Sequence, residues 1–369
     1  MVVATRTTRS TSASSVTPRR PTLSTIAVAA GVSVQTVSNV VNGRVAKVAE
    51  STRKRVEQEV VAQGYRPNKA ARLLRTNRSG LLGYRMRPTT DGINGSVLDR
   101  LLHALTERAH THGYGLIVFS SPNDEAEIAQ IDELRTENNV DGFLLTSTNH
   151  GDRRADWLTE NNVPFVAFGR PWGCVDAAGT RPHDWVDVDG SAGTREATEL
   201  LLSRGCRRIA FLGWPVGSGA GDDRRDGWAA ALRDAGVDTR LEEHCRDGVD
   251  FGHEAAVRLL AAGADGIVCA SDSLAIGALV ALRAANPQLA ENIVGFDDTP
   301  VAAAVGLTSV NQPIERAAGR MIDLLIHRIE HPEAPREQSP EQLLPPTLKE
   351  RTPLPGFTPA SLPPVLTEA

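Results

Sequence analysis

The sequence has little of several residue types that mark particular protein classes. Only 4% of its 369 residues are aromatic, so its cores must depend mainly on Val, Leu, Ile and Ala. The four cysteines are widely spaced, with no CxxC pair and no neighbouring histidine at metal-ligand spacing: Cys174, Cys206, Cys245 and Cys269. We therefore expect idle or buried thiols in a reducing compartment, and neither a metal site nor a cofactor.

Long apolar runs are absent as well. No stretch approaches the roughly 18 apolar residues of a membrane span. Residues 1–20 are rich in Ser, Thr and Arg and lack the apolar segment of a secretory signal. We expect these twenty residues to form a disordered polar arm and the Pro-rich residues 352–369 to pack little. The sequence thus predicts a cytoplasmic protein without membrane contact.

No catalytic motif is present. The nine histidines are scattered without an HExxH pattern, and neither Ser218 nor Ser273 lies in a GxSxG turn. The Gly-rich run 217–221 lacks the lysine of a phosphate-binding loop, and we interpret it as a flexible lid over a ligand. The paired carboxylates of a glycosidase are not excluded by sequence alone, but the features below favour a binding protein over an enzyme.

Charge is unevenly distributed along the chain. Residues 1–80 contain 14 Lys+Arg against 3 Asp+Glu, a net charge of +11. The remainder contains 26 against 42, a net charge of −16. A compact basic segment attached to an acidic body is typical of a nucleic-acid-binding module joined to a domain of another kind.

Residues 21–66 have the pattern of a helix-turn-helix domain. Thr22 is suited to cap a first helix, and Gly31 is suited to end it in a left-handed conformation. One apolar stripe of this helix is formed by Leu23, Ile26, Ala27 and Ala30. Ser33 then caps a second helix that stops at Asn42-Gly43, and a third helix is predicted over about Ser51–Gln63.

The second helix is predicted to read DNA. One of its faces is neutral and rich in hydrogen-bonding groups, as a recognition helix in the major groove requires. That face comprises Val34, Gln35, Ser38, Asn39 and Asn42. The alternative interpretation is an ordinary three-helix bundle with a polar face.

From Gly80 to about Arg351, short apolar strands alternate with amphipathic segments. The predicted strands are Leu81–Tyr84, Leu116–Phe119, Gly142–Leu145, Phe165–Phe168, Trp185–Val188, Arg208–Leu212, Gly266–Cys269 and Ile293–Phe296. This pattern favours parallel sheets covered by helices on both faces. The segment is too long for one such sheet, so we expect an α/β body of two lobes with a ligand cleft at the carboxyl ends of the strands.

Motifs in both parts resemble the lactose/galactose repressor family, from Thr22 to Arg351. The DNA-binding signature and hinge are matched by Ala27, Ala30-Gly31-Val32-Ser33, Thr36-Val37-Ser38, Asn42-Gly43, Thr52-Arg53, Gly64-Tyr65-Arg66-Pro67-Asn68 and Ala71-Arg72-Leu73-Leu74. The body is matched by Phe168-Gly169-Arg170-Pro171, Arg224, Gly227-Trp228, Ser271-Asp272, Gly295-Phe296-Asp297-Asp298 and Thr308–Pro313. The segment Gly213–Arg224 also looks similar to actinobacterial, sugar-responsive members.

The resemblance implies a homodimer on double-stranded operator DNA. The implied DNA-binding residues are Thr22, Ser33, Val34, Gln35, Thr36, Ser38, Asn39, Asn42, Asn68, Ala71, Arg72, Leu74 and Arg75. Residues 67–79 would be the hinge and linker, with Leu74 as a wedge in the minor groove or, alternatively, a linker leucine buried against the body. Asn39 replaces a frequent arginine, which favours an adenine contact over a guanine contact. Ala49 replaces a capping serine and predicts a weaker start of the third helix.

The resemblance also implies a body like that of periplasmic sugar-binding proteins. Its lobes would span roughly 80–187 with 313–335, and 188–312 with 336–351, joined by strand crossings near Val188-Asp189, Asn311–Pro313 and 335–340. The implied ligand-binding residues are Arg170, Trp172, Trp214, Arg224, Ser271, Asp272 and Asp297. An arginine opposite a carboxylate suits vicinal hydroxyls. The two tryptophans are placed either to stack on a sugar ring or to shield the rim of the cleft.

The sequence therefore predicts a transcriptional repressor, not an enzyme, that binds a near-palindromic operator as a dimer. A small sugar or oligosaccharide in the cleft would change its DNA affinity. Two alternatives remain: the same regulator with a purine or nucleobase co-repressor, and a sugar-binding protein without DNA function.

Overall fold

The computed structural model describes residues 21–41, 45–46, 48–65, 78–86, 92–137, 139–173, 183–237, 241–285, 287–336 and 342–352. The chain divides into two compact units between Asn77 and Arg78. Among the described residues no single helix is long and apolar enough to cross a membrane. The helices Leu23–Ala30 and Val34–Val41 are long and apolar enough for a membrane span only when they are taken together, and the chain bends by 107° between them.

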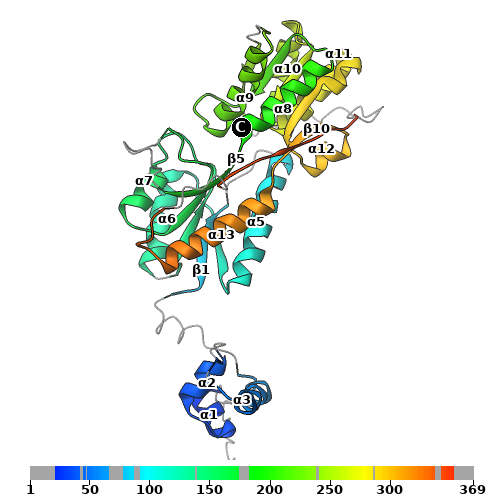
Figure 1. The fold of residues 1–369 in the computed structure, drawn as a ribbon. Coiled ribbons are helices and arrows are strands. Elements are labelled where there is room, and N and C mark those ends of the chain that lie inside the picture. The colour runs from blue at the N-terminus through cyan, green and yellow to red at the C-terminus, as the bar shows by residue number, and fades with distance from the viewer. Residues whose placement is uncertain are drawn as a thin grey trace, which may run out of the picture. The chain divides into compact units, whose positions relative to one another are not determined.

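The first unit is a bundle of three helices, α1 (Leu23–Ala30), α2 (Val34–Val41) and α3 (Glu50–Ala62) (Figure 1). Its core is formed by Ile26, Ala27, Ala30, Val37, Val40 and Val56. The helix-turn-helix pattern read from the sequence is confirmed, because the apolar stripe of α1 faces the valines of α2 and α3.

The ends of these helices follow from their capping residues. Thr22 Oγ1 accepts a hydrogen bond from the Thr25 amide at 3.3 Å, and Thr25 Oγ1 accepts one from the Thr22 amide at 2.9 Å. Gly31 ends α1 with a φ of 63°, and the Thr36 amide donates to Ser33 Oγ at 3.0 Å at the start of α2. Helix α3 begins after Ala49, which offers no side-chain cap.

The second unit contains two six-stranded sheets, each in its own lobe. The sheet of the first lobe is parallel, with strand order β11-β5-β4-β3-β1-β2. Its strands are β1 (Leu81–Arg85), β2 (Gly115–Phe119), β3 (Gly142–Leu145), β4 (Phe165–Phe168), β5 (Asp184–Val188) and β11 (Leu343–Leu344). The helices of this lobe are α5 (Gly92–Thr111), α6 (Asp124–Thr136), α7 (Arg153–Glu160) and α13 (Ile314–Glu330).

The second lobe has strand order β12-β10-β9-β8-β6-β7, in which only β12 runs antiparallel to its neighbour among the described pairs. Its strands are β6 (Ile209–Gly213), β7 (Glu242–His244), β8 (Gly266–Cys269), β9 (Ile293–Asp297), β10 (Thr308–Asn311) and β12 (Thr347–Lys349). Its helices are α8 (Gly190–Ser203), α9 (Ala220–Asp234), α10 (Val249–Ala261), α11 (Asp272–Ala285), the 3₁₀ turn η1 (Pro287–Asn292) and α12 (Pro300–Ala304).

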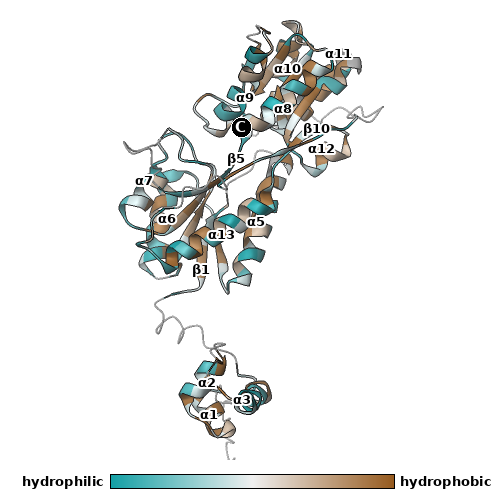
Figure 2. Cartoon of the chain, in the orientation of Figure 1, coloured by the Kyte–Doolittle hydropathy of each residue, from teal (hydrophilic) through white to brown (hydrophobic). Residues whose placement is uncertain are grey.

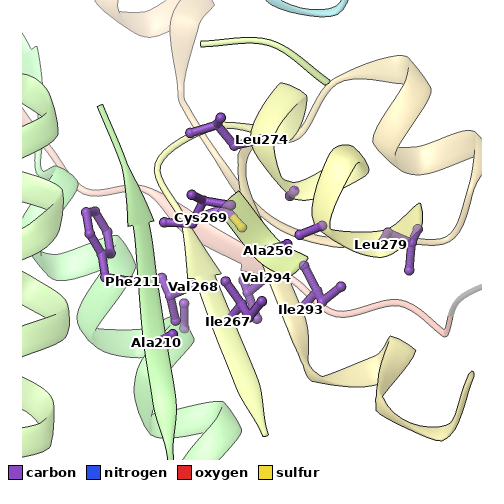
Figure 3. Close-up of a cluster of buried hydrophobic side chains, with 14 of the residues drawn as sticks. Ala210, Phe211, Ala256, Ile267, Val268, Cys269, Leu274, Leu279, Ile293 and Val294 are labelled. Carbon is purple, nitrogen blue, oxygen red and sulfur yellow. The ribbon is translucent and has the colours of Figure 1, made fainter. Parts of the chain in front are cut away.

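The central strands of both sheets are mostly hydrophobic, whereas their covering helices also carry hydrophilic stretches (Figure 2). Figure 3 shows this core in the second lobe, where Ile267, Val268, Ile293 and Val294 lie on neighbouring strands. All four are at most 1% exposed. Central strands covered on both faces need continuous apolar runs, which is why the sequence pattern located them.

Two cysteines confirm the expectation of buried thiols. Cys269 is fully buried in the second-lobe core, and desolvation raises the pKa of its thiol well above the ordinary value. Cys206 is 3% exposed, and burial raises its thiol pKa to about 11. Cys245 is half-buried, and Cys174 lies outside the described residues. A thiol that stays protonated at neutral pH is a poor nucleophile.

The predicted position of the third strand crossing is wrong. Leu343 and Leu344 pair with Asp187 and Val188 in the first-lobe sheet, although 336–351 were assigned to the second lobe. The chain therefore crosses between Leu344 and Thr347, after Leu344 has been buried in the first-lobe core. A strand of two residues is too short to show a hydrophobic periodicity, so the sequence does not indicate to which sheet it belongs.

Candidate functional site

A cavity of about 440 Å³ lies between the two lobes, within the usual range for small-molecule sites. Its lining residues are Val97, Leu98, Thr146, Ser147, Thr148, Asn149, Phe168, Gly169, Trp172, Asp187, Val188, Gly190, Trp214, Ser218, Ala220, Asp223, Arg224, Asp297 and Gln312. Most of them end or directly follow strands β3, β4, β5, β6, β9 and β10. This is the cleft at the carboxyl ends of the strands that the α/β pattern predicts.

Arg224 and Asp297 lie in the second-lobe wall of the cavity. Arg224 Nη1 lies 3.8 Å from Asp297 Oδ1, too far for a direct hydrogen bond. Its guanidinium donates to the Ala270 carbonyl oxygen and lies 3.7 Å above the centre of the Phe296 ring. An arginine fixed from behind, with a carboxylate beyond hydrogen-bond reach, leaves room for a ligand hydroxyl between the two.

Asp297 is held in an unusual environment. It is 5% exposed, and its Oδ1 accepts a hydrogen bond from Gln312 Nε2 at 2.6 Å. Desolvation raises its pKa to about 8, against the opposing charge of Arg224. Its φ of 118° lies in a region that residues other than glycine rarely adopt. Such strain at the end of a strand is typical of a binding position.

One tryptophan of each lobe lies in the cavity wall. Trp172 follows β4 in the first lobe and Trp214 follows β6 in the second. The guanidinium carbon of Arg170 lies 4.6 Å from the centre of the Trp172 ring, and that of Arg224 lies 4.9 Å from the centre of the Trp214 ring. Cation–π contacts of this kind fix the orientation of both indoles.

Arg170 joins the lobes instead of lining the cavity. Its Nε donates to Asp187 Oδ2 at 2.7 Å, and its Nη2 donates to Asp223 Oδ2 at 3.1 Å. Asp223 belongs to α9 of the second lobe and also accepts from the Ser191 amide at 3.0 Å. We call Arg170, Asp187 and Asp223 the inter-lobe brace.

Ser271 and Asp272, both implied as ligand residues, lie behind the cavity wall and not in it. Ser271 Oγ donates to Asp247 Oδ1 at 2.5 Å. Asp272 is fully buried; it accepts from Ser309 Oγ at 2.6 Å and from the Thr299 amide at 2.7 Å. Desolvation raises the pKa of Asp272 to about 6. These contacts hold the loops after β8 and β9 that carry the site.

The structure thus places four of the seven implied ligand residues in the cavity wall: Trp172, Trp214, Arg224 and Asp297. Sequence reasoning missed the first-lobe segment 146–149, whose short polar run after β3 matches no motif. Ser218 and Gln312 were not named as ligand residues, although Ser218 belongs to the run 217–221 interpreted as a lid and Gln312 belongs to the motif Thr308–Pro313. For the segment 146–149 and for Gln312, the position directly after a strand was the available signal.

In the first unit, α2 presents the predicted polar face. Val34 is 45% exposed, and Gln35 Nε2 donates to Asn39 Oδ1 at 3.1 Å. The two amide side chains are therefore aligned one turn apart on an exposed face. The remaining predicted contacts Asn42, Asn68, Ala71, Arg72, Leu74 and Arg75 lie outside the described residues.

Comparison with known proteins places these two units in one family. Residues 22–68 match the family described as bacterial regulatory proteins, lacI family, and residues 198–352 match a periplasmic binding protein-like domain. The chain is 34% identical to the HTH-type transcriptional regulator CelR of Thermobifida fusca, over 81% of this chain and 89% of that protein. The chain belongs to the lacI family.

Other lacI-family proteins agree with this assignment. The HTH-type transcriptional regulator AglR of Rhizobium meliloti is 31% identical over 80% of this chain and 84% of its own length. The solved structure of a CelR–cellobiose complex is 30% identical, covers 90% of this chain and 99% of its own, and superimposes with a TM-score of 0.66. The lac repressor dimer bound to operator shares the fold, with a TM-score of 0.71 at 24% identity, over 90% of this chain and 98% of that one.

Membership of the lacI family confirms the resemblance read from the sequence. The relatives named above are transcriptional regulators, and the family is not a family of enzymes. The helix-turn-helix unit and the periplasmic-binding-protein-like body are the two parts this family combines.

Proposed function

We propose that this lacI-family protein is a transcriptional repressor whose operator affinity is set by a sugar or oligosaccharide in the inter-lobe cavity. It acts as a homodimer on a near-palindromic operator. The observation that carries the ligand half of the proposal is the fixed Arg224 guanidinium 3.8 Å from the buried Asp297 carboxyl. Hydroxyl groups both donate and accept hydrogen bonds, so a vicinal diol matches this pair.

The DNA half rests on α2 and on the charge of the first unit. The aligned amides of Gln35 and Asn39 suit adenine edges in the major groove, where an amide can both accept from N6 and donate to N7. The net charge of +11 over residues 1–80 supplies phosphate contacts. We propose that residues 67–79 act as the hinge, with Leu74 inserted into the minor groove.

Ligand identity is supported by chemistry and by likeness. The two indoles provide flat apolar surfaces of the kind that pack on the C–H face of a sugar. The similar CelR structure is a complex with cellobiose, so cellobiose is the first sugar to test.

Ligand and operator would be linked through the relative placement of the lobes. Residues of both lobes line the cavity, so a bound ligand favours the arrangement of the lobes in which both sets of residues contact it. If that arrangement sets the hinges at a spacing unsuited to the operator, each ligand lowers the affinity for the other by the same factor.

The test is operator binding by the full-length protein. DNA fragments from its own locus are titrated by fluorescence anisotropy, at fixed salt, with and without cellobiose, maltose and hypoxanthine. The proposal expects specific binding that is at least tenfold weaker with one of the sugars. Binding that tightens only with hypoxanthine would instead establish a purine co-repressor, and sugar binding without any DNA binding would leave a sugar-binding protein.

A further inference from the structure

The chain enters the second unit at Arg78, and the two residues that follow are fixed by one carboxylate. Asp141 Oδ1 accepts hydrogen bonds from the Ser79 amide at 2.7 Å and from Ser79 Oγ at 2.9 Å. Asp141 Oδ2 accepts one from the Gly80 amide at 2.8 Å. Hydrogen bonds to a charged acceptor are stronger than those between neutral groups, so the backbone in front of β1 is held firmly.

Arg78 itself is fixed to the end of α13. Its Nη2 donates to the Ile329 carbonyl oxygen at 3.0 Å, and its Nη1 lies 3.5 Å from Glu330 Oε1. The last carbonyl groups of a helix have no partner within the helix, and a cation beside them also meets the negative end of the helix dipole. Arg78 therefore caps the carboxyl end of α13.

The end of α13 and the start of β3 meet at Gly142. A Cβ added to Gly142 would lie 3.0 Å from Leu325 Cδ1 and 3.2 Å from Ile329 Cδ1. The missing side chain therefore lets the last turns of α13 pack beside Asp141. We call this connected cluster the entry anchor; it comprises Arg78, Ser79, Gly80, Asp141, Gly142 and Ile329.

Two elements run from the entry anchor to the ligand cavity. Strand β3 follows Asp141 directly and is itself followed by the lining segment 146–149. Helix α13 starts two residues after Gln312, which lines the cavity and donates to Asp297, and it extends along the first lobe toward the start of β1 (Figure 1). Its 17 residues span about 25 Å. Regular elements thus join the cavity to the place where the chain enters the body.

The second lobe contains the same carboxylate clamp without the linker. Asp265 directly precedes β8, as Asp141 precedes β3. Its two carboxylate oxygens accept hydrogen bonds from the amides of Arg207 and Arg208, each at 2.8 Å. These two residues follow α8 of the same lobe. The clamp of the second lobe therefore fixes a connection within the lobe, whereas that of the first lobe fixes the connection to the DNA-binding unit.

We infer that Arg78 and Asp141 are positioning residues of the switch. They fix the point at which the DNA-binding unit is joined to the first lobe, so a movement of this lobe on ligand binding displaces the linker instead of being absorbed by it. Neither residue lines the cavity, so both act on the coupling between ligand and operator and not on ligand affinity. This inference rests on the proposed function and adds the residues that transmit its signal.

The test compares D141N with D265N, and R78M with R204M, in the full-length protein. Asparagine keeps the shape of aspartate but turns an N–H donor toward a backbone amide, and it does so equally in both lobes. Arg204 is the match for Arg78, because it also donates to the carbonyl oxygen of a helical turn and pairs with a glutamate, within the second lobe.

The measured quantity is the ratio of operator Kd with saturating cellobiose or maltose to operator Kd without sugar. D141N and R78M should each lower this ratio to about a third of the wild-type value or less, because a loosely held linker transmits less of the change. D265N and R204M should leave it unchanged. Sugar affinity without DNA, measured by calorimetry, should equal that of the wild type in all four variants, which also verifies that they are folded.

The outcomes separate the two proposals. Wild-type ratios in D141N and R78M, or equal losses in D265N and R204M, would overturn the inference and leave the proposed function in place. Weaker sugar binding by R78M without DNA would also overturn it, since Arg78 would then act on the cavity. Should D141N fail to fold, the comparison of R78M with R204M decides alone. If neither sugar changes the operator affinity of the wild type, the proposed function fails and the inference fails with it.

Discussion

Arg224 shows how far single residues were predictable. The family resemblance implied that Arg224 and Asp297 line the cleft, and the structure brings them 3.8 Å apart. The same resemblance implied that Asp272 lines the cleft, but its carboxylate instead accepts hydrogen bonds from Ser309 and Thr299. Whether a carboxylate after a strand faces the cavity or the loops behind it depends on tertiary contacts that no local pattern records.

Replacing Arg224 tests the ligand site at the residue scale. R224M keeps much of the aliphatic stem in its buried setting but removes the guanidinium, so sugar affinity should fall at least a hundredfold, since hydrogen bonds to a charged group are lost. Isothermal titration measures the change. R225M is the control, because Arg225 pairs with Glu242 instead of lining the cavity. Equal sugar affinity in R224M and R225M would remove Arg224 from the site.

The raised pKa of Asp297 makes a prediction about stability. Its pKa is about 8 in the folded protein and 3.8 ordinarily, so between these values the folded state holds a proton that the unfolded chain has released. The stabilisation from this proton is complete below about pH 4 and is lost as the pH rises toward 8.

The side chain of D297N cannot ionise at this position. As the pH rises from 5 to 8, the wild type should therefore lose thermal stability relative to D297N. The expected change in the difference is at least about 1 kcal/mol, or roughly 2–4 °C in Tm. D132N, at an exposed position on α6, is the control for the loss of one carboxyl group. A D297N difference that does not change with pH would contradict the raised pKa.

At the scale of elements, amphipathic helices and buried strands were predictable from sequence. Strands β3, β4 and β8 have the predicted bounds, because each is a continuous apolar run between turns. Strands β7, β10, β11 and β12 were not predicted. They contain two to four residues, and their pairing is set by the fold around them.

Helix α3 offers a test of capping. Ala49 makes no side-chain hydrogen bond to the first turn, so A49S should stabilise the helix by about 0.5–1 kcal/mol. Hydrogen exchange of the α3 amides in the full-length protein measures this change directly. The amides of α1 in the same sample serve as the reference. Unchanged protection of α3 would show that the cap position is not limiting.

Helix α2 carries the prediction for base recognition. N39A should weaken specific operator binding by about 1–3 kcal/mol, because a bidentate amide contact to a base is lost. Binding to nonspecific DNA should be unchanged. N139A, in the second unit, provides the matched asparagine control. Equal operator affinity in N39A and the wild type would show that Asn39 reads no base.

At the scale of the whole molecule, the resemblance predicted the two-lobed body and its cleft, but not the bonds across it. Arg170 was predicted to contact ligand. Its actual partners are Asp187 and Asp223, two acids that come together only when both lobes are folded. Pairing across lobes has no spacing in sequence by which it can be recognised.

The inter-lobe brace should govern coupling more than binding. R170M removes the bonds to both acids, so the lobes lose a fixed connection and the sugar-induced change in operator affinity should shrink several-fold. The ratio of operator Kd with and without saturating sugar measures this coupling. R195M breaks the exposed pair with Asp234 inside the second lobe and should leave the ratio unchanged. A normal ratio in R170M would assign the brace to stability alone.

The central claim is that a helix-turn-helix unit and a two-lobed sugar receptor act as one switch. Its most direct test is the anisotropy titration of full-length protein with duplex fragments from its own locus, with and without cellobiose or maltose. The account predicts specific binding with a Kd of about 10⁻⁸ M or tighter, weakened at least tenfold by one sugar. Failure to bind any of these fragments at low salt, with or without the sugars, would contradict it.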